Sequence, residues 1–200
     1  MKIKFLTISS LFFLNGCQAT APTMKNRISF EMDNKYWPAY SIVYKNNWPE
    51  CGNLSGTPDA IKKQRYITTY SSCKVSPEGY VPEQIIIEYT PWLTYEEQIK
   101  KGYGVPEELR YAQGEEATKK RISIMAAKQE AIAKIPATAW KRIVLTPPKE
   151  VEKYKYQVPE GKGNRSRGKN IYYIISLNPD GSYDIETKLY WVSKYQEKWN

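Results

Sequence analysis

The sequence predicts a single α+β domain, mainly antiparallel β-sheet with one long helix, over residues 27–200. Short apolar segments alternate with polar residues and end at Pro, Gly or Asn, as half-buried strands do. Asn178-Pro179-Asp180-Gly181 is a tight-turn sequence between two such segments. One long segment, Glu115–Ile135, has helical periodicity. The chain has 200 residues, which suits one domain with a substantial core.

Four strands are expected in the first half of the domain. The first has Ile28, Phe30 and Met32 alternating with polar neighbours. The second tolerates Pro38 near its start, where a missing N–H does little harm. The fourth is bounded by proline on both sides. The four segments are Arg27–Asp33, Tyr36–Tyr44, the weaker Arg65–Tyr70, and Gln84–Tyr89.

Three helices are expected in the middle of the chain. Thr94-Tyr95-Glu96-Glu97 has capping-box spacing and opens a short helix to about Lys100. Pro106 suits the first position of another short helix. The long helix begins with acidic residues and ends before Pro136. One face of it should pack on the sheet: Ile122, Met125, Ala126, Gln129, Ile132 and Ile135.

The last third of the domain should return to strands. Trp140–Leu145 is expected to be another strand and precedes Pro147-Pro148. Ile171–Leu177 and Ser182–Val192 flank the Asn-Pro-Asp-Gly sequence, so they predict an antiparallel hairpin. Pro fixes φ in this turn, and Gly181 supplies a left-handed conformation.

The N-terminal 16 residues are interpreted as a lipoprotein signal peptide. Lys2 and Lys4 precede an apolar segment, Phe5–Leu14, that is too short to cross a bilayer. Leu14-Asn15-Gly16-Cys17 resembles the lipobox of Gram-negative lipoproteins, in which the cysteine carries acyl chains such as palmitate. The resemblance implies lipidation of Cys17 and a tether over residues 17–26. The alternative is an ordinary signal peptide cut near Ala19 or Ala21.

The compartment follows from this leader. Gln18 after the cysteine is similar to lipoproteins that are sent to the outer membrane, so we expect an outer-membrane protein that faces the periplasm. That compartment is oxidising, and the two remaining cysteines, Cys51 and Cys73, are expected to form a disulfide. No second apolar segment approaches membrane-spanning length.

The charge pattern suggests contact segments for a partner. The formal net charge is +9, and 17 Tyr and 6 Trp accompany it. Such a surface favours acidic proteins or anionic lipid headgroups as partners. A nucleic-acid partner is not expected, because an outer-membrane protein has little access to nucleic acid. Two segments are predicted to bind the partner: Lys153, Tyr154, Lys155 and Tyr156, and the loop residues Lys162, Arg165, Arg167 and Lys169. The first segment also suits an edge strand protected by lysines.

Candidate catalytic and metal motifs are rejected, so no catalytic residue, cofactor or metal is predicted. The sequence has no histidine, which excludes His-dependent nucleophilic sites and the commonest zinc ligand. Ser71-Ser72-Cys73-Lys74 lacks the companion motifs of serine acyl-enzymes. Gly163–Asn170 resembles a phosphate loop, but a strand follows it instead of a helix. Asp180, Asp184 and Glu186 lack calcium-loop spacing. A carboxylate-dependent hydrolase is the remaining enzyme hypothesis.

Three segments resemble a family of short, uncharacterised proteobacterial lipoproteins: Tyr36–Tyr44, Pro82–Trp92, and the acidic Tyr95-Glu96-Glu97. Some small lipoproteins of this kind resemble periplasmic immunity proteins of type VI secretion effectors. The resemblance implies a non-enzymatic binding module that blocks a secreted toxin. The alternative is an envelope housekeeping lipoprotein that binds peptidoglycan, lipopolysaccharide or an assembly partner.

Overall fold

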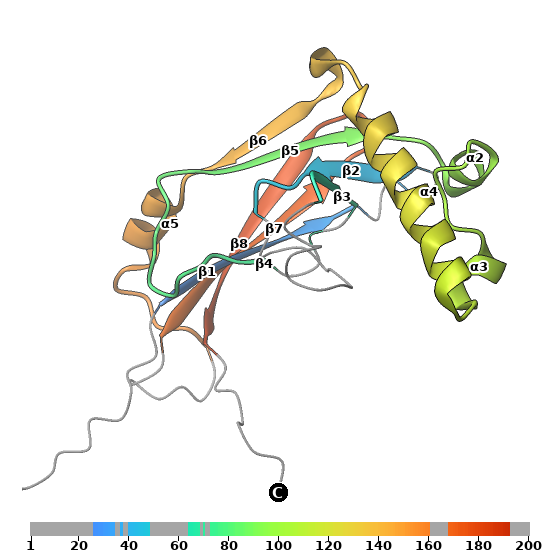
Figure 1. Ribbon diagram of the computed structural model, residues 1–200. Helices are drawn as coiled ribbons and strands as arrows, with labels where there is room; N and C mark the ends of the chain where they lie inside the picture. The colour runs from blue at the N-terminus through green and yellow to red at the C-terminus, as the bar shows by residue number, and fades with distance from the viewer. Residues whose placement is uncertain are drawn as a thin grey trace, which may run out of the picture.

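Two β-sheets face one another in the computed structural model (Figure 1). It describes residues 26–34, 37, 40–48, 64–68, 70, 73–160 and 168–192. Sheet A has the order β4-β1-β7-β8, and sheet B has the order β3-β2-β5-β6. The strands of sheet A are β1 (Arg27–Asp33), β4 (Cys73–Lys74), β7 (Lys169–Leu177) and β8 (Tyr183–Trp191), and those of sheet B are β2 (Ile42–Lys45), β3 (Tyr66–Ile67), β5 (Ile85–Pro91) and β6 (Lys141–Leu145).

All strand pairs in the described residues are antiparallel except β1 and β7, which run parallel. The predicted fold class, a single α+β domain with a mainly antiparallel sheet and one long helix, is confirmed. The β7–β8 hairpin is also confirmed. Its turn closes with Gly181 N–H donating to the Asn178 carbonyl at 2.9 Å, and Gly181 has φ +88°.

One hydrophobic core lies between the sheets. Alternate residues of β5 and β7 are buried in it, and Phe30 and Ile175 from sheet A join Tyr44 and Ile87 from sheet B in the same cluster. Tyr70 stands at the centre, 5.5 Å from the Phe30 ring and 5.1 Å from the Tyr44 ring between centroids. Its hydroxyl donates to the Lys45 carbonyl at 2.8 Å, which satisfies the polar end of a fully buried side chain.

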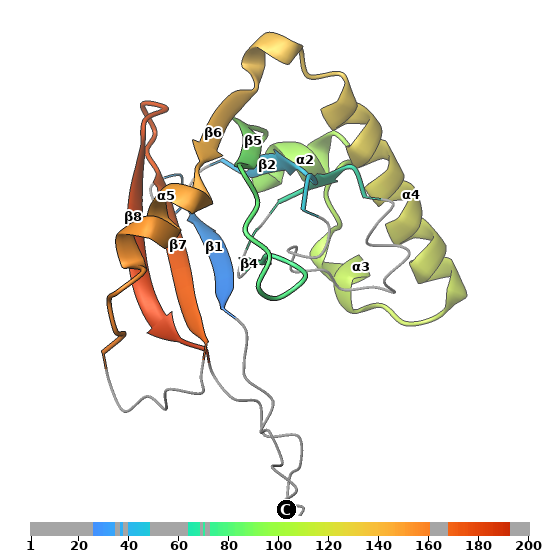
Figure 2. The ribbon, with the colours of Figure 1, turned by 90° about the vertical axis from the view of Figure 1, so that its left-hand side faces the viewer.

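Helices occupy the two ends of this sandwich, as Figures 1 and 2 show. At one end lie α2 (Tyr95–Lys100), α3 (Glu107–Tyr111) and α4 (Glu115–Ala133), and these three form the helical lobe. At the other end α5 (Pro147–Tyr154) packs Val151 and Tyr154 against the core. A 3-10 turn, Ala137–Ala139, links α4 to β6. The capping box predicted at Thr94 is present, with Thr94 Oγ1 accepting from Glu97 N–H at 3.2 Å.

Several boundaries differ from the expectation. The second strand begins at Ile42 rather than Tyr36, and Tyr40 is exposed. The third is two residues long. Pro106 is the N-cap of α3 and not its first residue. Pro147-Pro148 starts α5 because proline suits the first helical positions. The edge-strand interpretation of Lys153–Tyr156 is therefore wrong.

The predicted packing face of the long helix is also wrong in part. Ile132 is buried, but Ile122 and Met125 are 61% and 44% exposed. Sheet B ends at the two-residue β3, so only the C-terminal half of α4 has a sheet edge beside it. The N-terminal half packs on α3, where Arg121 Nη1 donates to the carbonyls of Leu109 and Ala112 at 2.9 and 2.7 Å.

Candidate functional site

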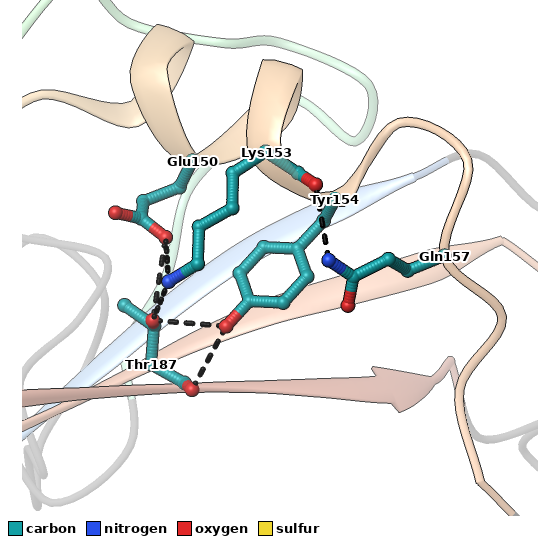
Figure 3. A network of polar contacts seen from close by, with 5 residues as sticks. All are labelled: Glu150, Lys153, Tyr154, Gln157 and Thr187. Carbon is teal, nitrogen blue, oxygen red and sulfur yellow. Dashed lines mark hydrogen bonds and ion pairs between the residues drawn. The ribbon is translucent and has the colours of Figure 1, made fainter.

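The predicted contact segment at the end of α5 is mostly occupied by internal bonds (Figure 3). Tyr154 Oη donates to the Thr187 carbonyl at 3.0 Å, and so its ring is fixed between α5 and β8. Lys153 Nζ lies 3.2 Å from Glu150 Oε2 and 3.3 Å from Thr187 Oγ1. The hydrogen bond to Glu150 raises the pKa of Lys153. These two side chains anchor the helix to the sheet.

Lys169 is equally committed to the fold. Its ammonium donates to the backbone carbonyls of Tyr154, the last residue of α5, and of Lys155 and Gln157, which follow it. A cation at a helix C-terminus satisfies carbonyls that have no partner within the helix. Tyr156 is 86% exposed and remains accessible to a partner. Lys162, Arg165 and Arg167 lie outside the described residues.

Tyr154, Lys155 and Lys169 line a cavity of about 500 Å³ together with Tyr80 and Val81, beside the start of β1. The structure therefore brings part of the predicted set together at the end of the molecule where the described chain begins. Nothing in the geometry of these residues assigns a ligand to the cavity.

The cysteines are only partly described. Cys17 and Cys51 lie outside the described residues, so the lipidation site and one half of the predicted disulfide stay predictions. Cys73 is fully buried at the edge of sheet A and is disulfide-bonded.

A second cavity, of about 390 Å³, lies between the helical lobe and sheet B and is called the lobe pocket below. Its floor includes Tyr66 and Ile67 of β3 and Ser41, which lies just before β2. Its walls come from α2, α4 and the loop 103–105. The volume is within the usual range of small-ligand sites. The sequence did not predict this pocket.

Gln98 holds the lobe pocket together. Its side chain is buried, and Nε2 donates to Ser41 Oγ at 2.7 Å and to the Leu93 carbonyl at 2.8 Å. Oε1 accepts from Lys128 Nζ at 3.2 Å. One glutamine thus joins α2 to sheet B and to α4. Both N–H donors of the Gln98 side-chain amide are used, and its Oε1 accepts from Lys128. The role of Gln98 is therefore to position Ser41 and Lys128.

The loop after α2 closes one wall. The backbone N–H groups of Tyr103 and Gly104 both donate to the backbone carbonyl of Gln98, at 2.8 and 3.0 Å. A Cβ added at Gly104 would lie 2.8 Å from Ile99 Cδ1 and 3.1 Å from Ile99 N, so only glycine lets the loop come this close to α2.

Two cations line the lobe pocket. Lys128 is partly buried, and burial lowers the pKa of its ammonium group. Its Nζ lies 5.5 Å from the centroid of the Trp92 ring. Arg110 lies over the Tyr95 ring, with Cζ 5.8 Å from the centroid, and donates to Tyr95 Oη at 3.4 Å. No Asp or Glu among the described residues lines the pocket.

Four large side chains of the helical lobe, Tyr95, Tyr111, Ile122 and Met125, are exposed, and this group is called the rim of the lobe pocket below. Tyr111 is 70% exposed and Ile122 is 61% exposed. Tyr95 and Met125 also line the pocket itself. Large apolar side chains grouped around a concave site are typical of surfaces that bind partners.

Other candidate motifs show ordinary structural roles. Asp180 Oδ1 accepts from the backbone and hydroxyl of Ser182, and these bonds lower the pKa of its carboxyl group. Glu186 pairs with Lys188 at 3.2 Å. Across the described ranges, no group of three His, Cys, Asp or Glu side chains is placed to hold a metal ion. No helix in the described part of the chain has the length and apolar character needed to span a bilayer.

The lobe pocket gave no local signal in the sequence. Gln98, Arg110 and Lys128 are spread over 31 residues of a charged segment and look like solvated helix positions. The one hint was Gln129, a polar residue within the face of the long helix that was predicted to pack on the sheet. No family model matches the chain, and no curated protein and no solved structure gives a match.

Proposed function

We propose that the protein is a lipid-anchored, non-enzymatic binding module that faces the periplasm and holds a secreted toxin through the rim of the lobe pocket. The observation that carries the proposal is the group of exposed aromatic and aliphatic side chains on the helical lobe, two of which, Tyr95 and Met125, line a cavity with no Asp or Glu among its described lining residues. Aromatic and aliphatic anchors of this kind supply most of the binding energy of protein interfaces.

The placement of the chain ends supports this orientation. The described chain enters the fold at β1, beside α5, and the helical lobe lies at the other end of the sandwich (Figure 1). A lipid on Cys17 would be joined to β1 by the tether predicted over residues 17–26, whose length corresponds to a reach of roughly 15–18 Å. The lobe would then be presented to the periplasm and not to the membrane.

A competition assay tests the toxin role. Cells that lack the gene are expected to be killed by a sibling strain that carries the type VI secretion effector encoded beside this gene. The wild-type gene should protect them. Tyr111→Ser and Ile122→Ser should abolish protection, since both remove exposed rim contacts. Val158→Ser, a change at a 72% exposed residue that follows α5, is the control and should protect fully. Protection by both rim variants would contradict the proposal.

The anchor is tested separately. Mass spectrometry of the native protein should find acyl chains on Cys17 and no residues 1–16. The housekeeping alternative predicts a different phenotype: sensitivity to detergents in the deletion strain, with no dependence on a toxin.

A further inference from the structure

The lobe pocket holds positive charge that the described fold does not neutralise. An ammonium group has three N–H donors, and Lys128 uses one of them, toward Gln98. Arg110 has five donors and makes one long bond, to Tyr95. No carboxylate of the described residues lies within ion-pair distance of either cation.

Burial makes the charged form of Lys128 costly, whereas Arg110 is exposed. Lys128 is kept partly out of water by α2 and Trp92, and the lower pKa of its ammonium group shows that burial disfavours the charged form. A cleft lined by charges of one sign attracts counter-ions, and a bound anion would supply the missing acceptors.

The remaining walls select the kind of anion. Ile124, Met125 and Ile132 make one side apolar, and Tyr95 and Tyr103 add two rings. The first residue of α2, Tyr95, lines the pocket, but a capping box formed by Thr94 and Glu97 already occupies N–H groups at that helix N-terminus, and the described lining residues form no glycine-rich cradle of the kind that favours phosphate. These walls fit an apolar body that carries one or two carboxylate oxygens.

We propose that the lobe pocket binds a carboxylate with an aromatic or aliphatic body, held by Lys128 and Arg110, with Gln98 as the positioning residue for Lys128. The inference deepens the proposed function and rests on it for one point, the source of the carboxylate. That source is either a free organic acid or an acidic side chain of the protein partner, and the two arms of the experiment distinguish these.

Isothermal titration of the folded domain with phenylacetate tests the chemistry. Phenylacetamide, which has the same ring and no charge, should bind roughly tenfold more weakly or worse, as expected for loss of charge-assisted hydrogen bonds. Binding should also weaken as salt is raised. Inorganic phosphate should bind more weakly than phenylacetate. Three results would overturn the proposal. They are equal binding of phenylacetate and phenylacetamide, tighter binding of phosphate than of phenylacetate, and no binding of either phenylacetate or the Glu peptide of the second arm.

A second arm uses an acetylated, amidated pentapeptide with one central Glu and its Gln counterpart. Preference for the Glu peptide over phenylacetate assigns the source to a protein side chain, and the reverse preference assigns it to a free acid. A peptide pair that binds equally, together with failure of the phenylacetate arm, overturns the carboxylate assignment.

Variants locate the site. Lys128→Met keeps the length of the side chain and should weaken phenylacetate binding roughly tenfold or more, as should Arg110→Gln. Lys119→Met, an exposed residue of the same helix paired with Glu115, is the control and should bind normally. Arg110 is exposed, so its variant stays informative if Lys128→Met folds poorly. Normal binding by Arg110→Gln and any folded Lys128→Met would overturn the assignment.

The proposed function can fail independently of this chemistry. Loss of protection in the Tyr111 and Ile122 variants reports on the rim alone, and titration of phenylacetate into Lys128→Met reports on the pocket alone. A protein that binds phenylacetate but gives no protection would retain the carboxylate site and lose the toxin role.

Discussion

Gln129 and Tyr66 are joined by a pair of hydrogen bonds that imitates a neighbouring strand. Gln129 Nε2 donates to the Tyr66 carbonyl at 2.9 Å, and Gln129 Oε1 accepts from the Tyr66 N–H at 3.1 Å. β3 is the edge strand of sheet B, so its outer backbone groups need partners. A side chain of α4 supplies them and fixes one wall of the lobe pocket.

Replacement of Gln129 by Met should therefore destabilise the fold. The change keeps the length of the side chain but removes both bonds to Tyr66, at a cost of about 1–3 kcal/mol in the free energy of unfolding. Urea unfolding measures it. Gln113→Met, the same replacement at an exposed position in the loop before α4, should change the free energy little. Equal losses in the two variants would show that the bonds to Tyr66 do not account for the effect.

Lys128 predicts a pH dependence of stability. Burial lowers the pKa of its ammonium group in the folded protein, and an unfolded lysine keeps a pKa near about 10.4. Between these two values the unfolded chain binds more protons, so the free energy of unfolding rises with pH. The stability penalty is fully present below the lowered pKa.

Comparison with Lys128→Met isolates this effect. The free energy of unfolding of the wild type minus that of the variant should increase as pH rises from about 7 toward about 10. Urea titrations at several pH values measure it. A difference that does not change with pH would show that the amine is as well solvated in the folded protein as in the unfolded chain.

Tyr154→Phe tests the connection between α5 and β8. The variant keeps the ring that packs on the core and loses the hydroxyl that donates to the Thr187 carbonyl. We expect a loss of about 1 kcal/mol in the free energy of unfolding. Tyr156→Phe removes a hydroxyl from a side chain that is 86% exposed, so it should have no effect in the same urea assay.

Lys169→Met tests the bonds at the C-terminal end of α5. Carbonyls of Tyr154, Lys155 and Gln157 lose their cationic donor. A loss of about 1–2 kcal/mol is expected, with faster hydrogen exchange in the last turn of α5. Lys149→Met, on the exposed surface of the same helix, is the matched control. Unchanged exchange in the last turn would mean that water replaces the ammonium at no cost.

A peptide map without reductant tests the two cysteine assignments together. Cys73 is disulfide-bonded, and Cys51 is its predicted partner. The expected product joins the peptide with Cys51 to the peptide with Cys73 and leaves Cys17 to the lipid. A bond between Cys17 and Cys73 would contradict both the disulfide prediction and the anchor.

Local patterns predicted the fold well where neighbours in sequence decide the structure. The strand around Phe30, the capping box at Thr94 and the turn at Gly181 each depend on a few adjacent residues, and each is present, although Ser29 in that strand is buried instead of exposed. The exposure of Ile122 could not be predicted, because it depends on how far sheet B extends beside α4.

The lobe pocket was out of reach for a similar reason. Gln98 reads as a solvated helix residue until the fold places Ser41 and Lys128 beside it. Conversely, Lys153-Tyr154-Lys155-Tyr156 reads as an open contact segment, and the structure uses Tyr154 to attach α5 to β8. Clusters of charge and aromatic residues in sequence do not reveal which side chains are already bonded within the protein.

The position of β1 determines when folding can finish. β1 lies between β4 and β7, and its contact with β7 joins residues as distant as Ser29 and Asn170, 141 positions apart. When the chain is synthesised or secreted from its N-terminus, the edge of β1 that pairs with β7 stays unpaired until residues 169–177 are available. Sheet A therefore closes late and slowly, as expected for pairing between distant segments. Any truncation upstream of Lys169 leaves that strand with an open edge that can recruit other chains.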